Sequence, residues 1–330
     1  TTLHRLLEFE PRSARFQRTA DAPLDVDAVI VDEASMIDLP LGAALLSATP
    51  SEARWVVVGD AVQLPSVGPG ALLRDLIDSG AVRVVRLNEI FRQGSESRIV
   101  ENAHRILVGE PPVSANAEET NADFFVVHRR DAEEAAALVV EFAATRIPKR
   151  FGFDPVKDIQ VLTPMHRGPA GTQVLNERLQ AALNPSGPSL DSRGQKLRVG
   201  DKVMQTKNDY ERDVFNGDLG VIVAVDASER RVRVRFDERE VDLEDTDLES
   251  LTLAYATSIH KSQGSEYPVV VLPLSSAHFV MLSRNLLYTA VTRAKRLCVV
   301  VADPRALRLA LSEVRREERS TRLRERLATP

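Results

Sequence analysis

The sequence predicts an α/β protein with two parallel-sheet units and a small all-β insertion in the second unit. Short β-branched runs alternate with helical stretches in two separate parts of the chain, which is typical of parallel sheets. Residues 197–253 interrupt the second part with several short strands and turn residues but no helical pattern. The length of 330 residues allows two substantial cores and a small third one.

The first unit contains two apolar strands at residues 28–31 and 55–58, each bounded by turn residues. Residues 82–87 hold three valines and a leucine, and they predict a third strand. Helical stretches at residues 39–46 and 71–77 lie between these strands. Because strand and helix alternate, the strands are expected to be parallel and joined by crossover helices.

The second unit repeats this alternation, and the insertion lies inside it. Its strands are predicted at 124–127, 159–162, 269–272 and 297–301, and its helices at 132–144, 172–183 and 283–294. The insertion has predicted strands at 202–205, 219–225, 231–236 and 240–243. Residues 184–194, rich in Pro, Gly and Ser, are expected to form a mobile loop, and residues 313–327 a solvated end helix.

Composition excludes several classes of protein. No apolar run approaches the ~20 residues that a membrane helix needs. The single cysteine, Cys298, lies in an apolar run, so it offers neither a disulfide framework nor a zinc site, and a reducing cytoplasm is expected. The formal charge of −5 excludes a uniformly basic surface but allows a local basic groove for nucleic acid.

An apolar strand at residues 29–31 ends in the carboxylate pair Asp32 and Glu33. In a parallel sheet, such a pair reaches the carboxyl edge where ligands bind. Asp32 would hold Mg²⁺, which prefers hard oxygen ligands, and Glu33 would orient or deprotonate an attacking water. Taken alone, a strand that ends in a solvated Asp-Glu pair is the more common explanation.

The next strand ends in Gly59-Asp60-Ala61-Val62-Gln63-Leu64-Pro65. The glycine permits a sharp exit from the strand, and the Gln63 amide can both donate to a phosphate and accept from a water. Together with the segment that holds Asp32 and Glu33, this stretch resembles motifs II and III of superfamily 1 helicases.

Three further segments resemble the remaining motifs in the family's order. Residues 87–93 resemble motif IV, residues 257–266 motif V and residues 287–294 motif VI. The resemblance implies that Arg92 and Arg293 act as arginine fingers on the γ-phosphate of ATP, with Gly264 and Glu266 also at the nucleotide. For Arg293, a structural arginine on a helix is the alternative.

The resemblance implies two RecA-like domains and an SH3-like β-barrel. Residues 1–86 would be a partial first domain, residues 87–196 with 252–330 the second, and residues 197–251 the barrel. ATP and Mg²⁺ would be the cofactors, and two domains would couple ATP hydrolysis to movement on single-stranded DNA and at single-strand/duplex junctions.

The spelling of motifs III and V resembles the RecD-like branch, superfamily 1B, whose members move 5′-to-3′. The residues that would contact DNA in this reading are His4, Arg5, Thr163, His166, Arg167, Asn216, Ser258, His260 and Lys261. His166 and His260 are each as well explained as ordinary surface or core histidines. Residues 9–22 occupy the place of the family's pin hairpin, although a plain linker fits them nearly as well. The barrel could also be a passive insert.

One departure from the family concerns the phosphate loop, a glycine-rich turn followed by Lys and Ser or Thr. No such stretch is present in the sequence, because Gly68-Pro69-Gly70 lacks the lysine. The chain is therefore expected to be a fragment that hydrolyses ATP poorly by itself. The alternative is a non-catalytic DNA-binding or scaffold module, although intact γ-phosphate sensors favour the motor.

Overall fold

The computed structural model describes residues 1–87, 97–116, 119, 122–192, 194–313, 319 and 321–328. The chain divides into two compact units, which are described separately. Unit 1 comprises Thr1–Ile90 and Arg315–Pro330, and unit 2 comprises Phe91–Val314. The C-terminal segment therefore belongs with the first unit, whereas the sequence grouped it with the second.

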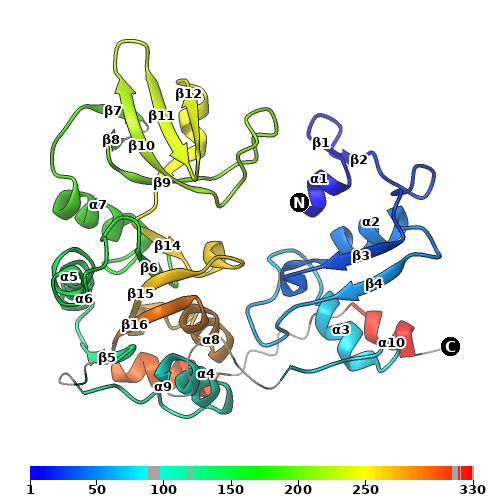
Figure 1. Ribbon diagram of the computed structural model, residues 1–330. Helices are drawn as coiled ribbons and strands as arrows, with labels where there is room; N and C mark the ends of the chain where they lie inside the picture. Colours follow the sequence, from blue (N-terminus) through cyan, green and yellow to red (C-terminus); the bar gives the residue numbers. More distant parts are fainter. Residues whose placement is uncertain are drawn as a thin grey trace. The chain divides into compact units, whose positions relative to one another are not determined.

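Unit 1 is built on two parallel strands, β3 (Ala28–Val31) and β4 (Arg54–Val57), which pair in register from Ala28 and Arg54 onward (Figure 1). Helix α2 (Leu39–Ala48) joins them, and Asp38 starts it by accepting a hydrogen bond from the Leu41 N–H. Helix α3 (Leu72–Ser79) follows β4 and packs against α10 (Leu323–Ala328). Two of the three predicted strands and both predicted helices are confirmed to within two residues.

One sequence prediction for unit 1 was wrong. Residues 82–87 form no strand, and Val85 and Leu87 are 72% and 90% exposed. β-branched residues favour a strand only where a neighbouring strand takes up the backbone hydrogen bonds, and none does so here among the described residues. Of the predicted end helix, the described residues form α10, whose side chains are not buried although it contacts α3.

A small hairpin precedes this sheet in the sequence. Helix α1 (Leu3–Leu6) leads into β1 (Phe9–Glu10) and β2 (Arg15–Phe16), which pair antiparallel with Phe9 opposite Phe16. The hairpin lies within residues 9–22, the segment that the sequence allowed to be either a pin or a linker.

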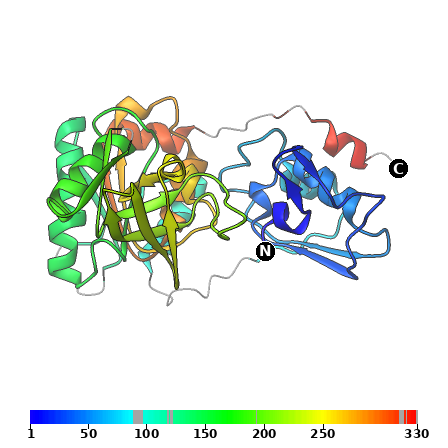
Figure 2. The same ribbon diagram turned by 90° about the horizontal axis from the view of Figure 1, so that it is seen from above.

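Unit 2 contains a five-stranded parallel sheet in the order β14-β6-β15-β16-β5. Helices α5 and α7 pack on one face, and α8, with α4, packs on the other (Figures 1 and 2). The strands are β5 (Phe124–His128), β6 (Ile159–Thr163), β14 (Ala256–Ser258), β15 (Tyr267–Leu274) and β16 (Ala294–Ala302). The helices are α4 (Arg98–Val108), α5 (Ala132–Glu141), α6 (Ile147–Phe151), α7 (Thr172–Leu183), α8 (Arg284–Thr292) and α9 (Pro304–Ser312).

Both faces of this sheet are buried, as expected for parallel strands with helices on each side. Val269 and Val271 belong to the core that includes α5 and α7, while Val270 and Leu272, on the opposite face, are equally inaccessible. All strands predicted for this unit are present, and the three predicted helices are present within a few residues. The α/β fold class is therefore confirmed. Helices α4 and α9 were not foreseen.

The insertion is a five-stranded antiparallel sheet in the order β12-β11-β10-β9-β13. Its strands are β9 (Lys202–Gln205), β10 (Leu219–Asp226), β11 (Arg231–Phe236), β12 (Arg239–Leu243) and β13 (Leu251–Leu253). The predicted mobile loop at 184–194 instead contributes β7 (Ser189–Ser192), which pairs with β8 (Gln195–Arg198). Leu190 and Leu197 face each other in this hairpin and are buried, which explains why β7 and β8 pair.

Buried polar groups join the insertion to the rest of unit 2. Asp201 is fully buried and accepts hydrogen bonds from the side chains of Gln180, Asn184 and Tyr255. The Lys202 ammonium donates to the Ile159 carbonyl at 3.1 Å, and burial lowers the pKa of this lysine to about 8. The insertion is thus held to α7 and β6 by polar contacts as well as by a shared apolar core.

No helix in the described part of the chain combines the length and apolarity that crossing a bilayer would require.

Candidate nucleotide and nucleic-acid sites

The carboxylate pair lies at the carboxyl edge of the unit 1 sheet. Asp32 directly follows β3 and is exposed, and one of its oxygens accepts the Glu33 N–H at 2.8 Å. Glu33 has a φ of 51°, a left-handed conformation that is uncommon for a residue with a side chain. The Ala34 N–H donates to the Val58 carbonyl, so the turn after β3 is tied to the end of β4.

Gln63 lies in the turn that follows the neighbouring strand β4. Its amide nitrogen donates to Asp60 Oδ2 at 3.3 Å, and its backbone N–H donates to the Asp60 carbonyl. Asp60 also accepts the Val62 N–H and so shapes the turn. The sequence analysis assigned Asp60 no role, and its position directly after Gly59 is the signal that could have singled it out. Because β3 and β4 are parallel, Asp32, Glu33 and Gln63 all follow strands that end at one edge.

A magnesium ion fits this edge better than a metal that needs a protein cage. The described residues include no group of three or more His, Cys, Asp or Glu side chains that could hold a metal ion. Magnesium usually keeps several waters and is bound through one or two carboxylates together with substrate phosphates. The exposed carboxylate of Asp32 offers that kind of ligand.

Arg293 lies at the C-terminal end of α8, and its side chain contacts the loop that contains Gly264 and Glu266. It is only 3% exposed, and its Nη1 donates to the Ser265 carbonyl at 3.1 Å. Within the described part of the chain, its buried Nε has no hydrogen-bond partner. Gly264 has a φ of 75°, and Glu266 forms an ion pair with Lys295 at 3.0 Å. Three residues predicted to serve the nucleotide are thus brought together from two motifs.

Two loops of unit 2 begin side by side at the carboxyl edge of its sheet. Thr163 and Ser258 occupy paired positions at the ends of β6 and β14, and the Ile259 N–H donates to the Thr163 carbonyl. Both side chains are buried, and the Thr163 hydroxyl donates to the Ala170 carbonyl at 2.6 Å. These two residues shape the loops from within.

The residues that follow them carry the accessible donors. His166 and Arg167 are exposed in the first loop, and the His166 Nδ1 lies 3.0 Å from the Thr172 hydroxyl at the start of α7. His260 and Lys261 belong to a short helical turn in the second loop, where Lys261 is exposed. Desolvation by the surrounding chain lowers the pKa of Lys261 below the ordinary lysine value. The two loops thus present four nitrogen-bearing side chains near one sheet edge.

His4 and Arg5 lie on α1 in unit 1 and differ in environment. Arg5 is exposed, whereas the His4 ring contacts Phe9 and Phe16 of the hairpin, with ring centroids 5.4 and 5.6 Å apart. His4 therefore supports the hairpin by ring packing.

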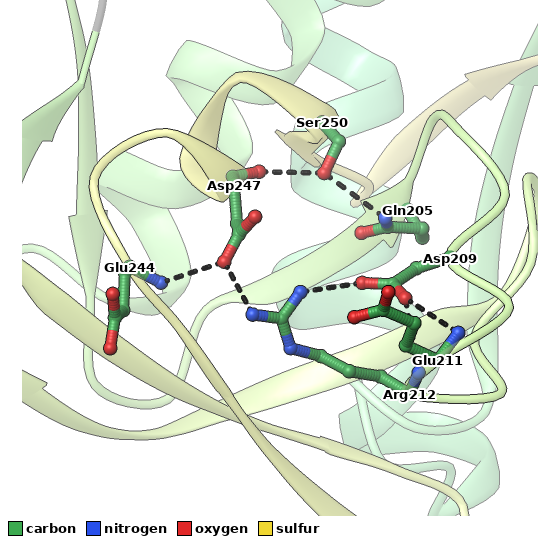
Figure 3. A network of polar contacts seen from close by, with 7 residues as sticks. All are labelled: Gln205, Asp209, Glu211, Arg212, Glu244, Asp247 and Ser250. Carbon is green, nitrogen blue, oxygen red and sulfur yellow. Dashed lines mark hydrogen bonds and ion pairs between the residues drawn. The ribbon is translucent and has the colours of Figure 1, made fainter. Parts of the chain in front are cut away.

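Asn216 is exposed in the loop between β9 and β10, where its N–H donates to the Asn208 side chain. Arg212 fixes this loop through ion pairs with Asp209 at 2.6 Å and Asp247 at 2.8 Å (Figure 3). Burial raises the pKa of Asp209, but its hydrogen bonds and the charge of Arg212 outweigh burial, so the net pKa is lowered. The loop that presents Asn216 is therefore internally braced. Arg92, the remaining predicted site residue, lies outside the described residues.

Family models match three stretches of the chain. Residues 1–131 match an AAA domain, residues 175–236 match the SH3 domain of ATP-dependent RecD-like DNA helicases, and residues 253–301 match the UvrD-like helicase C-terminal domain. The SH3 match overlaps the insertion and the helix α7 that precedes it.

Curated relatives match nearly the whole chain but are longer than it. The ATP-dependent RecD2 DNA helicase of Deinococcus radiodurans is 37% identical over 99% of this chain, which spans 43% of that protein. The RecBCD enzyme subunit RecD of Mycolicibacterium smegmatis is 34% identical over 99% of this chain, which spans 59% of that protein.

Solved structures of similar fold agree with these matches. The Pif1 helicase from Bacteroides, in complex with ADP-AlF3 and ssDNA, has a TM-score of 0.56 at 18% identity and covers 94% of this chain and 80% of its own. The Pif1 helicase from Candida albicans has a TM-score of 0.52 at 17% identity, covering 96% and 79%. These likenesses support the RecA-like fold of the sheets. The domain models and the relatives show that this chain belongs to the RecD-like helicase family.

Proposed function

We propose that this chain is part of the motor of an ATP-dependent DNA helicase that moves 5′-to-3′ on single-stranded DNA. The observation that carries this proposal is the environment of the buried Arg293 side chain. Arg293 lies against the loop of Gly264 and Glu266, and its Nε has no hydrogen-bond partner among the described residues. This donor is therefore available to bind a phosphate oxygen. A purely structural arginine would be expected to satisfy its buried donors.

The residues of unit 1 complete the proposed chemistry. Asp32 would hold Mg²⁺, which neutralises phosphate charge when it is bound. Glu33 would orient or deprotonate the attacking water, and Gln63, held by Asp60, would bridge the water and the γ-phosphate. Arg92 and Arg293 would stabilise charge that develops on the transferred phosphoryl group.

The loops of unit 2 supply the proposed DNA track. Arg167, His166, His260 and Lys261 would contact backbone phosphates, while Thr163 and Ser258 set the loop geometry. Arg5 in unit 1 and Asn216 on its braced loop would add contacts, and the hairpin supported by His4 would meet the single-strand/duplex junction. The DNA helicase among the relatives and the Pif1 structure with ssDNA support single-stranded DNA as a proposed partner, the family's pin hairpin supports single-strand/duplex junctions, and the buried Cys298 is compatible with the cytoplasm.

A non-catalytic DNA-binding or scaffold module is the second candidate, because the sequence contains no glycine-rich phosphate loop. The 330 residues by themselves are therefore proposed to hydrolyse ATP poorly. The two candidates differ in one measurable property, since a scaffold would bind DNA without any DNA-stimulated ATP turnover in the complete protein.

The test compares Arg293→Ala with Arg308→Ala, an exposed arginine on α9 that serves as the control. In the complete protein, Arg293→Ala should reduce DNA-stimulated ATP turnover by on the order of 10³–10⁵, with DNA binding largely retained. The control should turn over ATP like the wild type. Turnover of Arg293→Ala within a few-fold of wild type would reject the finger role.

Direction is tested separately with tailed duplexes. The complete protein should unwind duplexes that carry a 5′ single-stranded tail and leave those with only a 3′ tail intact. A preference for 3′ tails would reject the 5′-to-3′ assignment while leaving the helicase proposal in place.

A further inference from the structure

The loop at residues 66–70, three residues after Gln63, is bound by an arginine from the other end of the chain. Arg319 Nη1 donates to the Gly68 carbonyl at 2.6 Å, the Gly70 carbonyl at 2.7 Å and the Ser66 hydroxyl at 3.1 Å. Its Nη2 donates to the Ser66 carbonyl at 2.8 Å. One guanidinium therefore donates hydrogen bonds to three backbone carbonyls and one hydroxyl of a single short loop.

The same loop is closely packed on its other side. The Pro69 carbonyl accepts the N–H of Leu39 at the start of α2. A Cβ added at Gly68 would lie 1.9 Å from Asp38 Oδ2, and a Cβ added at Gly70, whose φ is +98°, would lie 2.3 Å from Leu39 Cγ. A side chain at either position would require the loop or the residues at the start of α2 to shift, and the positive φ of Gly70 favours glycine there as well.

Three carbonyl dipoles that point at one place repel one another unless a cation or several donors lie between them. Arginine suits this place because its planar fork carries five donors, whereas lysine offers a compact charge on a flexible stem. The arginine is itself anchored, since the nearby Thr321 hydroxyl donates to Asp75 on α3 at 2.8 Å and α10 packs on α3. Arg319 and Ser66 are 253 residues apart in the sequence, but both belong to unit 1.

We propose that Arg319 is a positioning residue that holds loop 66–70 and thereby fixes the turn that carries Gln63. Only Leu64, which is 7% exposed, and Pro65 separate Gln63 from Ser66, which is 3% exposed. Asp60 holds the turn before Gln63, and the clamped loop holds the chain after it. The catalytic part of this inference rests on the proposed function of Gln63.

The first test measures the clamp without any activity. Hydrogen exchange of the backbone amides in residues 66–71 is followed in the complete protein for Arg319→Ala, Arg319→Lys and the control Arg324→Ala, an exposed arginine of α10. Exchange should rise on the order of tenfold in Arg319→Ala and less in Arg319→Lys, with no change in the control. Unchanged exchange in Arg319→Ala would overturn the clamp.

The second test asks whether the clamp matters for catalysis. DNA-stimulated ATP turnover in Arg319→Ala should lose on the order of tenfold in kcat with little change in the KM for ATP, and millimolar methylguanidinium should restore much of it. Faster exchange with unchanged kcat would overturn the positioning role. If Arg319→Ala folds poorly, Thr321→Val, which weakens the anchor only, should give the same changes at smaller size; wild-type values in both measurements would reject the inference.

These outcomes separate the inference from the proposed function. A wild-type complete protein without ATP turnover would refute the proposed motor, while the exchange measurement would still decide whether Arg319 holds the loop.

Discussion

The two parallel sheets differ in burial although their strands are similar in sequence. In unit 1, Ile30 of β3 is 73% exposed and Val56 of β4 is 49% exposed, while Val29 and Val31 on the other face of β3 are buried. In unit 2, Ile159 of β6 is 2% exposed, and β6 is buried at every position. An isoleucine at a strand position therefore has opposite environments in the two units.

The difference shows that the apolar content of a strand does not determine how much it contributes to stability. Helices cover both faces of the unit 2 sheet, so each buried side chain there is removed from water. In unit 1, the described residues bury one face of β3 against a smaller core that includes Leu7, Leu45 and Leu73. Unit 2 is therefore expected to be the more stable of the two.

The largest expected effect is separate unfolding of the two units. The chain has a single tryptophan, Trp55, and it packs against the core of unit 1. In urea, the Trp55 fluorescence of the 330-residue chain should change at a midpoint lower by about 1 M than the main far-UV circular dichroism transition. Coincident transitions would show that the units unfold together. That result would contradict the expected difference in stability between the two units.

The next effect compares one substitution at matched positions. Ile159→Ala should lower the free energy of unfolding of unit 2 by about 2–5 kcal/mol, because it leaves a cavity in a closed core. Ile30→Ala should change the stability of unit 1 by less than about 0.5 kcal/mol, because the side chain is already in water. Both are measured by urea titration of the 330-residue chain. A large loss for Ile30→Ala would mean that this face is covered in solution.

The smallest expected effect is a pH dependence of stability that arises from Lys202, a lysine buried in unit 2. The folded pKa of Lys202 is about 8, against an ordinary value of 10.5, so the unfolded state binds more protons between these pH values. The wild type should therefore gain stability relative to Lys202→Met as pH rises from 8 toward 10.5, by at most about 3 kcal/mol.

Comparing the wild type with Lys202→Met cancels the contributions of other groups that titrate between pH 8 and 10.5. Burial raises the pKa of Cys298 and Tyr255, which lowers stability at alkaline pH, but both are present in wild type and variant alike. Urea titrations at pH 7.5, 9 and 10 measure the difference. A difference that does not vary with pH would show that Lys202 is charged or solvated in the folded protein.

Much of the architecture follows from local sequence. The alternation of apolar runs and helices predicted β3, β4, β6, β15 and β16 within a few residues, because period and turn residues are local properties. The carboxylates Asp32 and Glu33 and the glutamine Gln63 could be singled out for the same reason, since the carboxylates directly follow one apolar strand and Gln63 lies in the turn after the next. The strand prediction for residues 82–87 was wrong because a strand also needs a neighbouring strand to pair with, which the local sequence pattern does not reveal.

The order and type of the elements, and the motifs at the strand ends, were determined by the sequence by itself. Tertiary structure decided which groups meet. Arg293 lies against Ser265, and Arg319 binds Ser66, Gly68 and Gly70 from a distant part of the chain. Such contacts depend on how helices and loops pack after the chain has folded, and a mixed-charge C-terminal stretch carries no local sign of its partner. Tertiary packing also determines that Ile30 is exposed and Ile159 is buried, although both are isoleucines on strands.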